Sequence, residues 1–365
     1  MSFSFSSMIR LIVLLAIGST MVAVGLSRLD PDRANWRFLK PARFSNVNEY
    51  FLDVADRTPR WLDSESGRVE AYPLADDDVL EAASCAPWSN EQGQTQVVGR
   101  WSSRTKDGPM SMSNDFGLAR YTFPGGEMLD HISTEIVPIS PPCWYPGIRA
   151  RVLFPGGDGL LYHFAFESDP GAGGPPTPVR SADDHPGPIP WRCKRPGEGG
   201  VFISDVTWPE DPKMRGALVV ALREQLTGPG GSKVFSRTRL WWLKLNSAGT
   251  AIVDADRLVV PDVSGSRPVE VDERSPSVTT RPDGSLMLAY LRQRAGQKGW
   301  SLHLAPISID ERRGAPVVLE SKVKRRGDRC QPAQPTFSPD GRWVNAIADV
   351  SSTESHVIRL STAGL

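Results

Sequence analysis

Residues 335–348 read PTFSPDGRWVNAIA, and this stretch decides the fold. Pro339, Asp340 and Gly341 form a turn signal within it, because proline fixes φ, aspartate accepts hydrogen bonds from backbone amides ahead of it, and glycine tolerates positive φ. After the turn, apolar residues alternate with the period of two that a β-strand requires. A further strand-like segment follows at residues 356–360. The stretch therefore predicts strand, tight turn, strand, loop and strand.

The same plan recurs upstream. Residues 275–290 read SPSVTTRPDGSLMLAY, with another strand-like segment at residues 300–304. Looser copies precede it, and intervals of 44 to 71 residues separate consecutive copies. The copies are anchored on an aromatic residue or its equivalent, at Phe44, Trp88, Trp144, Trp208, Thr279 and Phe337. Each interval also has room for a second hairpin, which is clearest at residues 240–253.

Four strands in each of six copies predict an all-β fold, a six-bladed β-propeller of four-stranded antiparallel blades. The composition agrees, because 33 Gly and 32 Pro in 365 residues are too many turn formers for a helical bundle. A single blade cannot bury both faces of its sheet, so blades have to stack around an axis. The last copy ends one strand short, and the alternating residues 35–40 are a candidate for the strand that closes the ring. The alternative for residues 35–40 is a stalk before the domain.

The units at residues 337–341 (FSPDG) and 281–284 (RPDG) resemble the repeats of the TolB-like, or WD40-like, β-propeller superfamily. The resemblance extends from Phe44 to the end of the chain, and its motifs are specific in the last two copies. It implies the propeller fold. Propellers of this kind serve as docking platforms, as gates of peptidases and as glycan-handling domains, so the resemblance implies no single activity.

An uncharged apolar run occupies residues 11–26, after a segment with one positive charge at Arg10. A helix of this length spans about 24 Å, less than the hydrocarbon core of a bilayer, which is typical of a signal peptide or a short anchor. We therefore predict a signal or anchor helix at residues 1–27, a linker with the ring-closing strand at residues 28–43, and the propeller at residues 44–365. The protein is then extracytoplasmic, either membrane-anchored or secreted or periplasmic. A buried N-terminal core helix is the alternative.

The four cysteines are an even set in a chain with an export signal, which permits one or two disulfides without fixing their pairing. They are Cys85, Cys143, Cys193 and Cys330. No two of them form a C-x-x-C pair, so neither a zinc site nor a thioredoxin-type redox pair is indicated. Reduced, buried cysteines are the alternative.

The sequence predicts no catalytic residue, no cofactor and no metal site. His163, His303 and His356 lie inside strand-like runs, which indicates structural roles, and no G-x-S-x-G elbow of a hydrolase is present. Residues 89–95 resemble a single imperfect Asp-box of sialidases, which is a turn element even in that family. The 42 basic and 42 acidic residues give no net charge, which argues against a nucleic-acid partner.

We expect a non-enzymatic recognition or scaffolding module, exported and tethered through its N-terminal segment, because rigid propellers present contacts on variable loops. Its partner would be a protein or a glycan at one face of the propeller. Trp191 and Trp241 are the candidate partner-binding residues, since exposed aromatic rings stack on sugars or peptides. The alternative is an extracytoplasmic glycan-active or lyase-type propeller enzyme. Such an enzyme should gather acidic or basic side chains with perturbed pKa values in its channel.

Overall fold

The computed structural model describes most of the chain after Trp36. The described residues are 37–41, 50–52, 59–62, 69–74, 78–86, 95–103, 116–123, 125–146, 150–166, 174–181, 201–209, 211–214, 216–227, 229–258, 271–297, 299–310, 315–319, 321–325, 333–337, 341–349 and 355–363. The chain divides into two units, Met1–Trp36 and Arg37–Leu365, and every described residue lies in the second.

Among the described residues the only helical segments are two short 3-10 helices, η2 (Pro212–Met214) and η3 (Pro229–Gly231). No helix in these ranges is long and apolar enough to cross a membrane. The predicted signal or anchor helix at residues 1–27 lies outside the described residues. Export and extracytoplasmic location therefore stay predictions.

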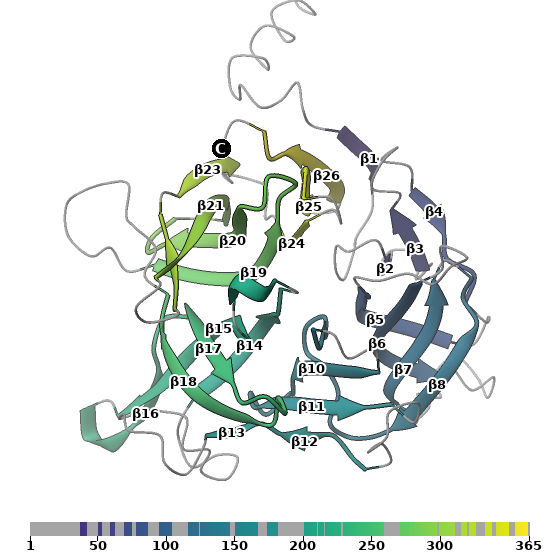
Figure 1. Cartoon of the computed structure of the whole chain (residues 1–365), viewed down its shortest axis with the longest axis horizontal. Helices are drawn as coiled ribbons and strands as arrows, with labels where there is room; N and C mark the ends of the chain where they lie inside the picture. Colours follow the sequence, from purple (N-terminus) through teal and green to yellow (C-terminus); the bar gives the residue numbers. More distant parts are fainter. Residues whose placement is uncertain are drawn as a thin grey trace, which may run out of the picture. The chain divides into compact units, whose positions relative to one another are not determined.

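The described strands form six sheets, and consecutive sheets follow the chain around a common centre (Figure 1). The first two contain β2 (Tyr50–Leu52), β3 (Pro59–Leu62) and β4 (Val69–Ala71), then β5 (Asp78–Cys85), β6 (Thr95–Ser103), β7 (Phe116–Phe123) and β8 (Met128–Ser133). The third contains β9 (Cys143–Trp144), β10 (Arg151–Pro155), β11 (Leu161–Ala165) and β12 (Thr177–Pro178).

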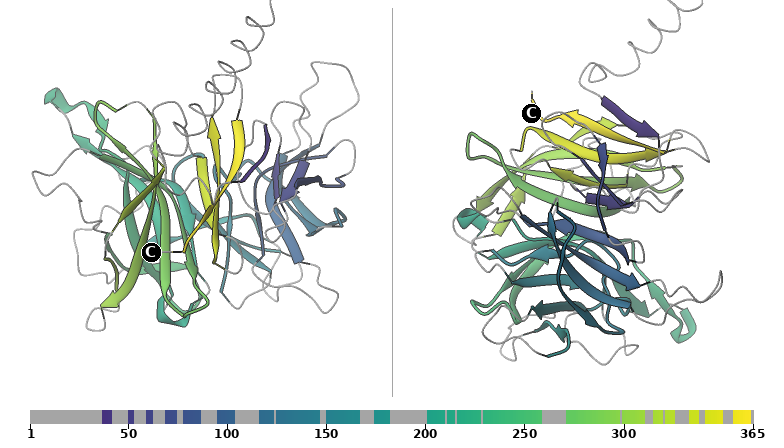
Figure 2. Two further views of the ribbon diagram at one scale, coloured as in Figure 1. Left: turned by 90° about the horizontal axis from the view of Figure 1, so that it is seen from above. Right: turned by 90° about the vertical axis from the view of Figure 1, so that its right-hand side faces the viewer.

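The fourth sheet has six strands: β13 (Arg180–Ser181), β14 (Val201–Thr207), β15 (Ala217–Thr227), β16 (Lys233–Phe235), β17 (Arg239–Leu245) and β18 (Ala251–Arg257). The fifth contains β19 (Val271–Thr280), β20 (Leu286–Arg294), β21 (Ser301–Asp310), β22 (Ala315–Val318) and β23 (Lys322–Arg325). The last contains β24 (Ala333–Phe337), β25 (Trp343–Asp349), β26 (Ser355–Ser361) and β1 (Arg37–Pro41). The strands run between the two faces of the propeller, as the turned views in Figure 2 show.

The prediction of six four-stranded blades is wrong. The structure has five blades of four or more strands, and the segment assigned to the first copy forms the three-stranded sheet β2–β3–β4. The strands of this sheet are only three or four residues long. The strand that precedes them in the described chain, β1, pairs with β26 instead, with Arg37 opposite Arg359 and Phe38 opposite Ile358. β1 overlaps the candidate closing strand at residues 35–40, and it supplies the fourth strand of the last blade.

Neighbouring blades bury their faces against each other, and β15 shows why. Leu218, Val220 and Leu222 pack in a cluster shared with the β9–β12 sheet, whereas Val219 and Ala221 pack in a cluster shared with the β19–β22 sheet. All five side chains are fully buried. Successive side chains of a strand point to opposite faces, so an unbroken apolar run marks a strand that is buried on both sides. Each such side chain contributes about 1.5–3 kcal/mol to folding.

The tight turn predicted at residues 281–284 is confirmed. The Gly284 amide donates a hydrogen bond of 2.8 Å to the Arg281 carbonyl, and Gly284 has a φ of 77°. The Asp283 carboxylate accepts a bond of 2.9 Å from the Ser285 amide. The turn joins β19 to β20, which pair in antiparallel register. Residues 338–340 of the equivalent turn lie outside the described residues.

Polar contacts also join one blade to the next. Tyr145 comes directly after β9. Its hydroxyl donates a buried hydrogen bond of 2.7 Å to the carbonyl of Gly249, which lies in the turn between β17 and β18. Gly249 has a φ of 71°, and a Cβ at this position would collide with the Tyr145 ring. Glycine is required here both by the backbone conformation and by the close approach of the ring.

We expect Gly249→Ala to destabilise the fold more than Gly296→Ala does. Both glycines have positive φ, but nothing lies within 4 Å of a Cβ placed on Gly296. The left-handed conformation costs about 1–2 kcal/mol in both variants, and overpacking against Tyr145 adds about 1–3 kcal/mol in the first. Urea unfolding of the two variants measures the difference. Equal losses would show that the contact between the blades contributes little.

Candidate functional site

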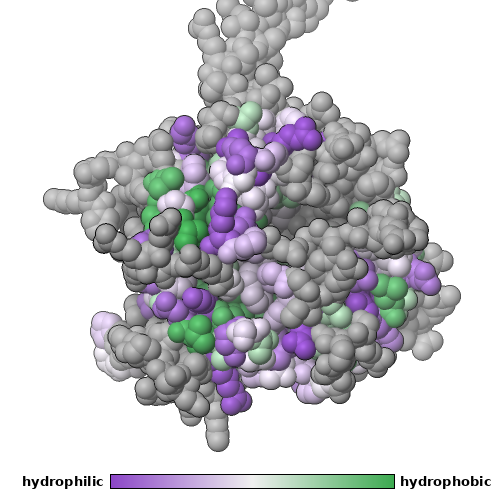
Figure 3. All heavy atoms as spheres, in the orientation of Figure 1, coloured by the Kyte–Doolittle hydropathy of each residue, from purple (hydrophilic) through white to green (hydrophobic). Residues whose placement is uncertain are grey.

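The edge strands of all five blades meet at a cavity of about 210 Å³. These strands are β5, β9, β14, β19 and β24, and in Figure 1 the last three lie on the inner sides of their sheets. The residues that they place in the cavity wall are Ser84, Cys143, Trp144, Asp205, Val206, Thr207, Ser275, Pro276, Ser277, Pro335 and Thr336. Hydrophobic and hydrophilic residues are mixed on the face of the molecule seen in Figure 3.

Four of these edge strands carry a register shift beside the cavity. The shifts lie between Glu81 and Ser84, between Ile203 and Asp205, between Arg274 and Ser277, and between Ala333 and Thr336. A bulge of this kind bends a strand and changes the direction of a side chain. Two described non-glycine residues have positive φ, Ala82 at 44° and Ser275 at 49°, and both lie in these shifts. Strained backbone of this kind concentrates at functional sites.

Asp205 is the one carboxylate among the described residues of the cavity wall. It is half-buried at the bulge of β14. The Ser204 hydroxyl lies 2.9 Å from its Oδ2 atom and donates a hydrogen bond. From β19, the Ser275 amide and hydroxyl donate long bonds of 3.4 and 3.5 Å. The carboxyl group of one blade is therefore held by the strained residue of the next.

Burial raises the pKa of the Asp205 carboxyl above its ordinary value. Hydrogen bonds from Ser204 and Ser275 and the positive charge of Arg274 lower it, but less strongly. A carboxyl group with a raised pKa is a stronger base and keeps its proton to higher pH, which suits a general acid or base. Asp205 is therefore the best candidate for an acid–base residue in the described cavity.

Two buried donors in the cavity wall have no hydrogen-bond partner among the described residues. They are the Trp208 indole Nε1 and the Ser140 hydroxyl. The Trp208 ring packs on the Tyr145 ring, with 4.8 Å between their centroids, which fixes its position. Buried polar atoms are nearly always paired, so two such atoms in one cavity indicate that a ligand or water completes them.

Other chemistry is not supported by the described lining. Hydrolysis by paired carboxylates needs a second carboxylate near the first, and the described wall contains only Asp205. The described residues hold no group of three or more His, Cys, Asp and Glu side chains that could bind a metal ion. Cys143 is free, and burial raises the pKa of its thiol, which makes it a poor nucleophile.

Sequence reasoning did not find this site. Of its two candidate residues, half-buried Trp241 lines a different cavity beside β17, and Trp191 lies outside the described residues, so its role stays a prediction. The sequence did contain a usable signal, which is the position of the wall residues just before the repeat anchors. Ser84, Asp205 and Thr336 each precede an anchor by one to four positions, the anchors being Trp88, Trp208 and Phe337. Positions just before each anchor therefore mark the inner wall.

His303 is buried on β21, as expected for a structural residue. Its ring Nδ1 lies 3.0 Å from the Ser321 hydroxyl, and its ring packs against that of Tyr290. His163 is on β11, where burial and the charge of Arg151 lower the pKa of its imidazole. The side chains of Cys85, Cys193 and Cys330 lie outside the described residues.

The fold is similar to those of several solved enzymes, although no protein family model and no curated protein matches the sequence. The α-L-arabinanase of Penicillium chrysogenum, solved with arabinobiose, has 12% identity and a TM-score of 0.50, covering 90% of this chain and 94% of its own. The oligogalacturonate lyase of Vibrio parahaemolyticus has 12% identity and a TM-score of 0.42, covering 86% of this chain and 74% of its own.

An endo-arabinase of Bacteroides thetaiotaomicron has 11% identity and a TM-score of 0.40, covering 80% of this chain and 97% of its own. At these identities the likeness shows the fold alone. The chain is a β-propeller. Its membership of the TolB-like superfamily stays a prediction, because no model of a family matches.

We expect Asp205→Asn to remove a fall in stability that the parent protein shows as pH rises. With its pKa raised, the folded chain keeps a proton on Asp205 at pH values where the unfolded chain has lost it. Stability then falls as pH rises from the ordinary aspartate pKa through the raised value, and asparagine does not titrate. Urea unfolding over a pH series tests this, and the variant should gain on the parent protein with increasing pH.

Asp283→Asn serves as the control of opposite sign. Hydrogen bonds from Ser285 hold the pKa of the exposed Asp283 carboxyl below its usual range. This variant should therefore lose stability relative to the parent protein as pH rises. If the stability of the parent protein and of Asp205→Asn changed with pH in the same way, the raised pKa assigned to Asp205 would be contradicted.

Proposed function

We propose that the protein is a glycan-active β-propeller whose central cavity binds a sugar unit, with Asp205 as its acid–base residue. The observation that carries the proposal is one half-buried carboxyl group with a raised pKa beside two unpartnered buried donors, Trp208 Nε1 and Ser140 Oγ. The five blades converge on this cavity, which is where a propeller offers its most enclosed surface.

The composition of the wall favours a sugar over a hydrophobic ligand. Trp144, Trp208 and the neighbouring prolines offer apolar surfaces, and Ser84, Ser277 and Thr336 offer hydroxyl groups. A sugar ring presents both C–H faces and hydroxyl groups, so it needs this alternation of apolar surface and hydrogen-bonding atoms. The solved arabinanase with a similar fold was crystallised with arabinobiose, which is a sugar.

Lyase-type elimination fits the wall better than hydrolysis does. In an elimination, one base takes the proton from the ring carbon next to a uronate carboxylate, and the C–H electrons form a C=C double bond as the C–O bond to the leaving sugar breaks. The leaving oxygen then takes a proton back from the protonated base or from solvent. Asp205 supplies such a base, and its raised pKa strengthens it. A non-enzymatic recognition module, which the sequence favoured, would use the same cavity for binding alone.

The test is to incubate the full chain with neutral and acidic oligosaccharides, among them arabino-oligosaccharides and oligogalacturonates. Binding is measured by calorimetry, and unsaturated or shortened products by chromatography. We expect one class to bind and to be cleaved, and Asp205→Asn to reduce turnover by about 10²–10⁴-fold. Asp283→Asn makes the same chemical change on an exposed turn and should leave turnover unchanged.

Trp208→Phe removes the indole donor while keeping an aromatic ring. Losing one such hydrogen bond should weaken sugar binding by about fivefold to tenfold. Binding without turnover would support the recognition role and refute the enzymatic one. No binding to any member of the panel would overturn both.

A further inference from the structure

A second cavity, of about 780 Å³, lies between the fourth and fifth blades. Its wall comes from β15, β17 and β18, from the segment between β16 and β17, and from the start of β19. It shares no wall residue with the central cavity. The two cavities adjoin at the bulge of β19, where Arg274 lines one and Ser275 lines the other.

The described wall of this cavity is strongly basic. Five arginines face two carboxylates, which leaves a formal surplus of three positive charges. The arginines are Arg223, Arg237, Arg239, Arg257 and Arg274, and the carboxylates are Glu224 and Asp272. The chain as a whole has no net charge, so this surplus is a local concentration. Like charges at short range repel, and a bound anion would offset the part of this cost that the neighbouring carboxylates do not.

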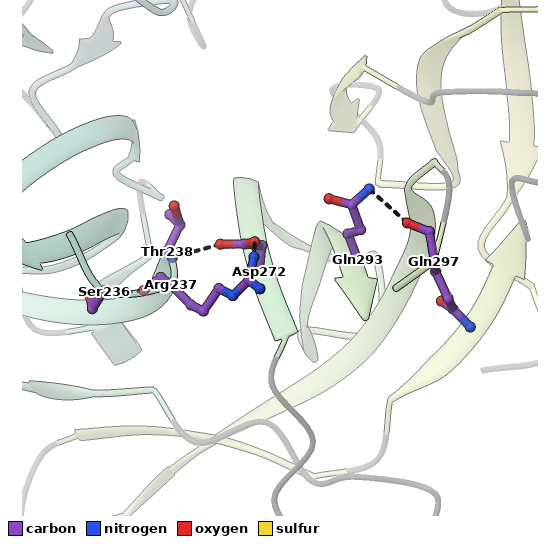
Figure 4. A network of polar contacts seen from close by, with 6 residues as sticks. All are labelled: Ser236, Arg237, Thr238, Asp272, Gln293 and Gln297. Carbon is purple, nitrogen blue, oxygen red and sulfur yellow. Dashed lines mark hydrogen bonds and ion pairs between the residues drawn. The ribbon is translucent and has the colours of Figure 1, made fainter. Parts of the chain in front are cut away.

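Asp272 is already counted in this surplus, and its carboxylate is paired within the wall. Figure 4 shows Arg237 and Thr238 pointing toward it from the segment before β17. The Thr238 amide donates a bond of 2.8 Å to one oxygen, and the Arg237 guanidinium lies 3.0 Å from the other. The neighbouring Glu273 is also committed, since its Oε1 atom lies 3.5 Å from Arg292 Nε.

Arg239, Arg257 and Arg274 have no ion-pair partner in the described ranges. One nitrogen of Arg239, Nη1, is buried and makes no hydrogen bond to the described residues. Burial lowers the pKa of this guanidinium, Arg257 and Arg292 lower it further, and Glu273 and Asp272 act against them. A buried guanidinium nitrogen without an acceptor is costly, so the cavity lacks an acceptor at this point.

An aromatic ring stands beside these charges. Trp241 is half-buried, lies two residues after Arg239 on β17, and is opposite Arg257 on β18. Residues two apart on a strand share a face, and directly opposed residues on paired strands do so as well. Arg239, Trp241 and Arg257 therefore share one face of the blade, with Arg274 across the cavity on β19.

We propose that this cavity is a binding site for an oxyanion group, such as a sulfate, phosphate or carboxylate, held by Arg239, Arg257 and Arg274. Guanidinium groups bind oxyanions through paired, charge-assisted hydrogen bonds, and their planar shape suits such groups. The Trp241 ring would contact the part of the ligand that carries the anion. The anion belongs either to a small free molecule or to an acidic saccharide. This inference does not depend on the proposed activity of the central cavity.

The test is calorimetric titration of the full chain with sodium sulfate, sodium phosphate and an oligogalacturonate, with a neutral oligosaccharide as the uncharged probe. We expect the anions to bind, and to bind more weakly as sodium chloride is raised. Any heat from the neutral probe reports the central cavity and should be the same in the parent protein and in Arg257→Gln. An oligogalacturonate whose Arg257-dependent binding is tighter than that of sulfate or phosphate identifies an acidic saccharide as the ligand class. The reverse order identifies a free anion.

Arg257→Gln is the principal variant, because Arg257 is exposed and its replacement leaves the core intact. We expect it and Arg239→Gln to weaken anion binding about tenfold or more. Arg180→Gln removes the same charge from exposed β13 of the same sheet, outside the cavity, and should bind as the parent protein does. Trp241→Phe should remove any fluorescence change that the anion causes.

Equal binding by the parent protein and Arg257→Gln, or an equal loss in Arg180→Gln, would overturn the proposal. Absence of anion binding in the parent protein at low ionic strength would also overturn it. The dependence of anion binding on Arg257 is read at the second cavity, and the dependence of turnover on Asp205 is read at the first, so the two proposals can fail separately.

Discussion

The burial of both faces of each sheet is the constraint on which the rest of the structure depends. Every side chain of β15 from Ala217 to Leu222 is fully buried, and alternate residues belong to clusters shared with different neighbours. A sheet of this kind is unstable alone, because one face or the other would meet water. The blades therefore stabilise each other, and contacts such as Tyr145 with Gly249 set their spacing.

Because the faces of the sheets are buried and apolar, the polar side chains of the central cavity lie on the inner edge strands. The inner edge strands have no neighbouring strand on the side that faces the cavity. Four of them shift register beside it. The positive φ of Ala82 and Ser275 is tolerated because the stacked blades hold the backbone on both sides. Asp205 is half-buried for the same reason, since its position follows from the bulge rather than from any pairing of its own charge.

The two cavities differ in charge although they adjoin at one bulge. The described wall of the central cavity has a single carboxyl group among hydroxyl and aromatic side chains, whereas the described wall of the second is dominated by arginine. Both cavities lie where β19 meets the fourth blade. At the central cavity, Ser275 donates a hydrogen bond to Asp205. At the second cavity, Arg274 lines the wall together with Arg239 and Arg257. A ligand at one cavity would therefore act on a strand that also forms the wall of the other.

The sequence by itself determined the strand and turn plan, because the alternation of apolar residues and the Arg-Pro-Asp-Gly turn depend on local geometry. It also led to the propeller fold, since the repeated plan leaves each sheet with two faces to bury. The candidate closing strand at residues 35–40 could also be found from the sequence, and β1 pairs with β26. The number of full blades was decided by tertiary pairing, because the described strands of the first copy form only the three-stranded sheet β2–β3–β4. The candidate site was decided in the same way. Asp205 and Ser275 are 70 residues apart, and the five arginines of the second cavity come from five different strands or segments, so only the packing of blades brings them together.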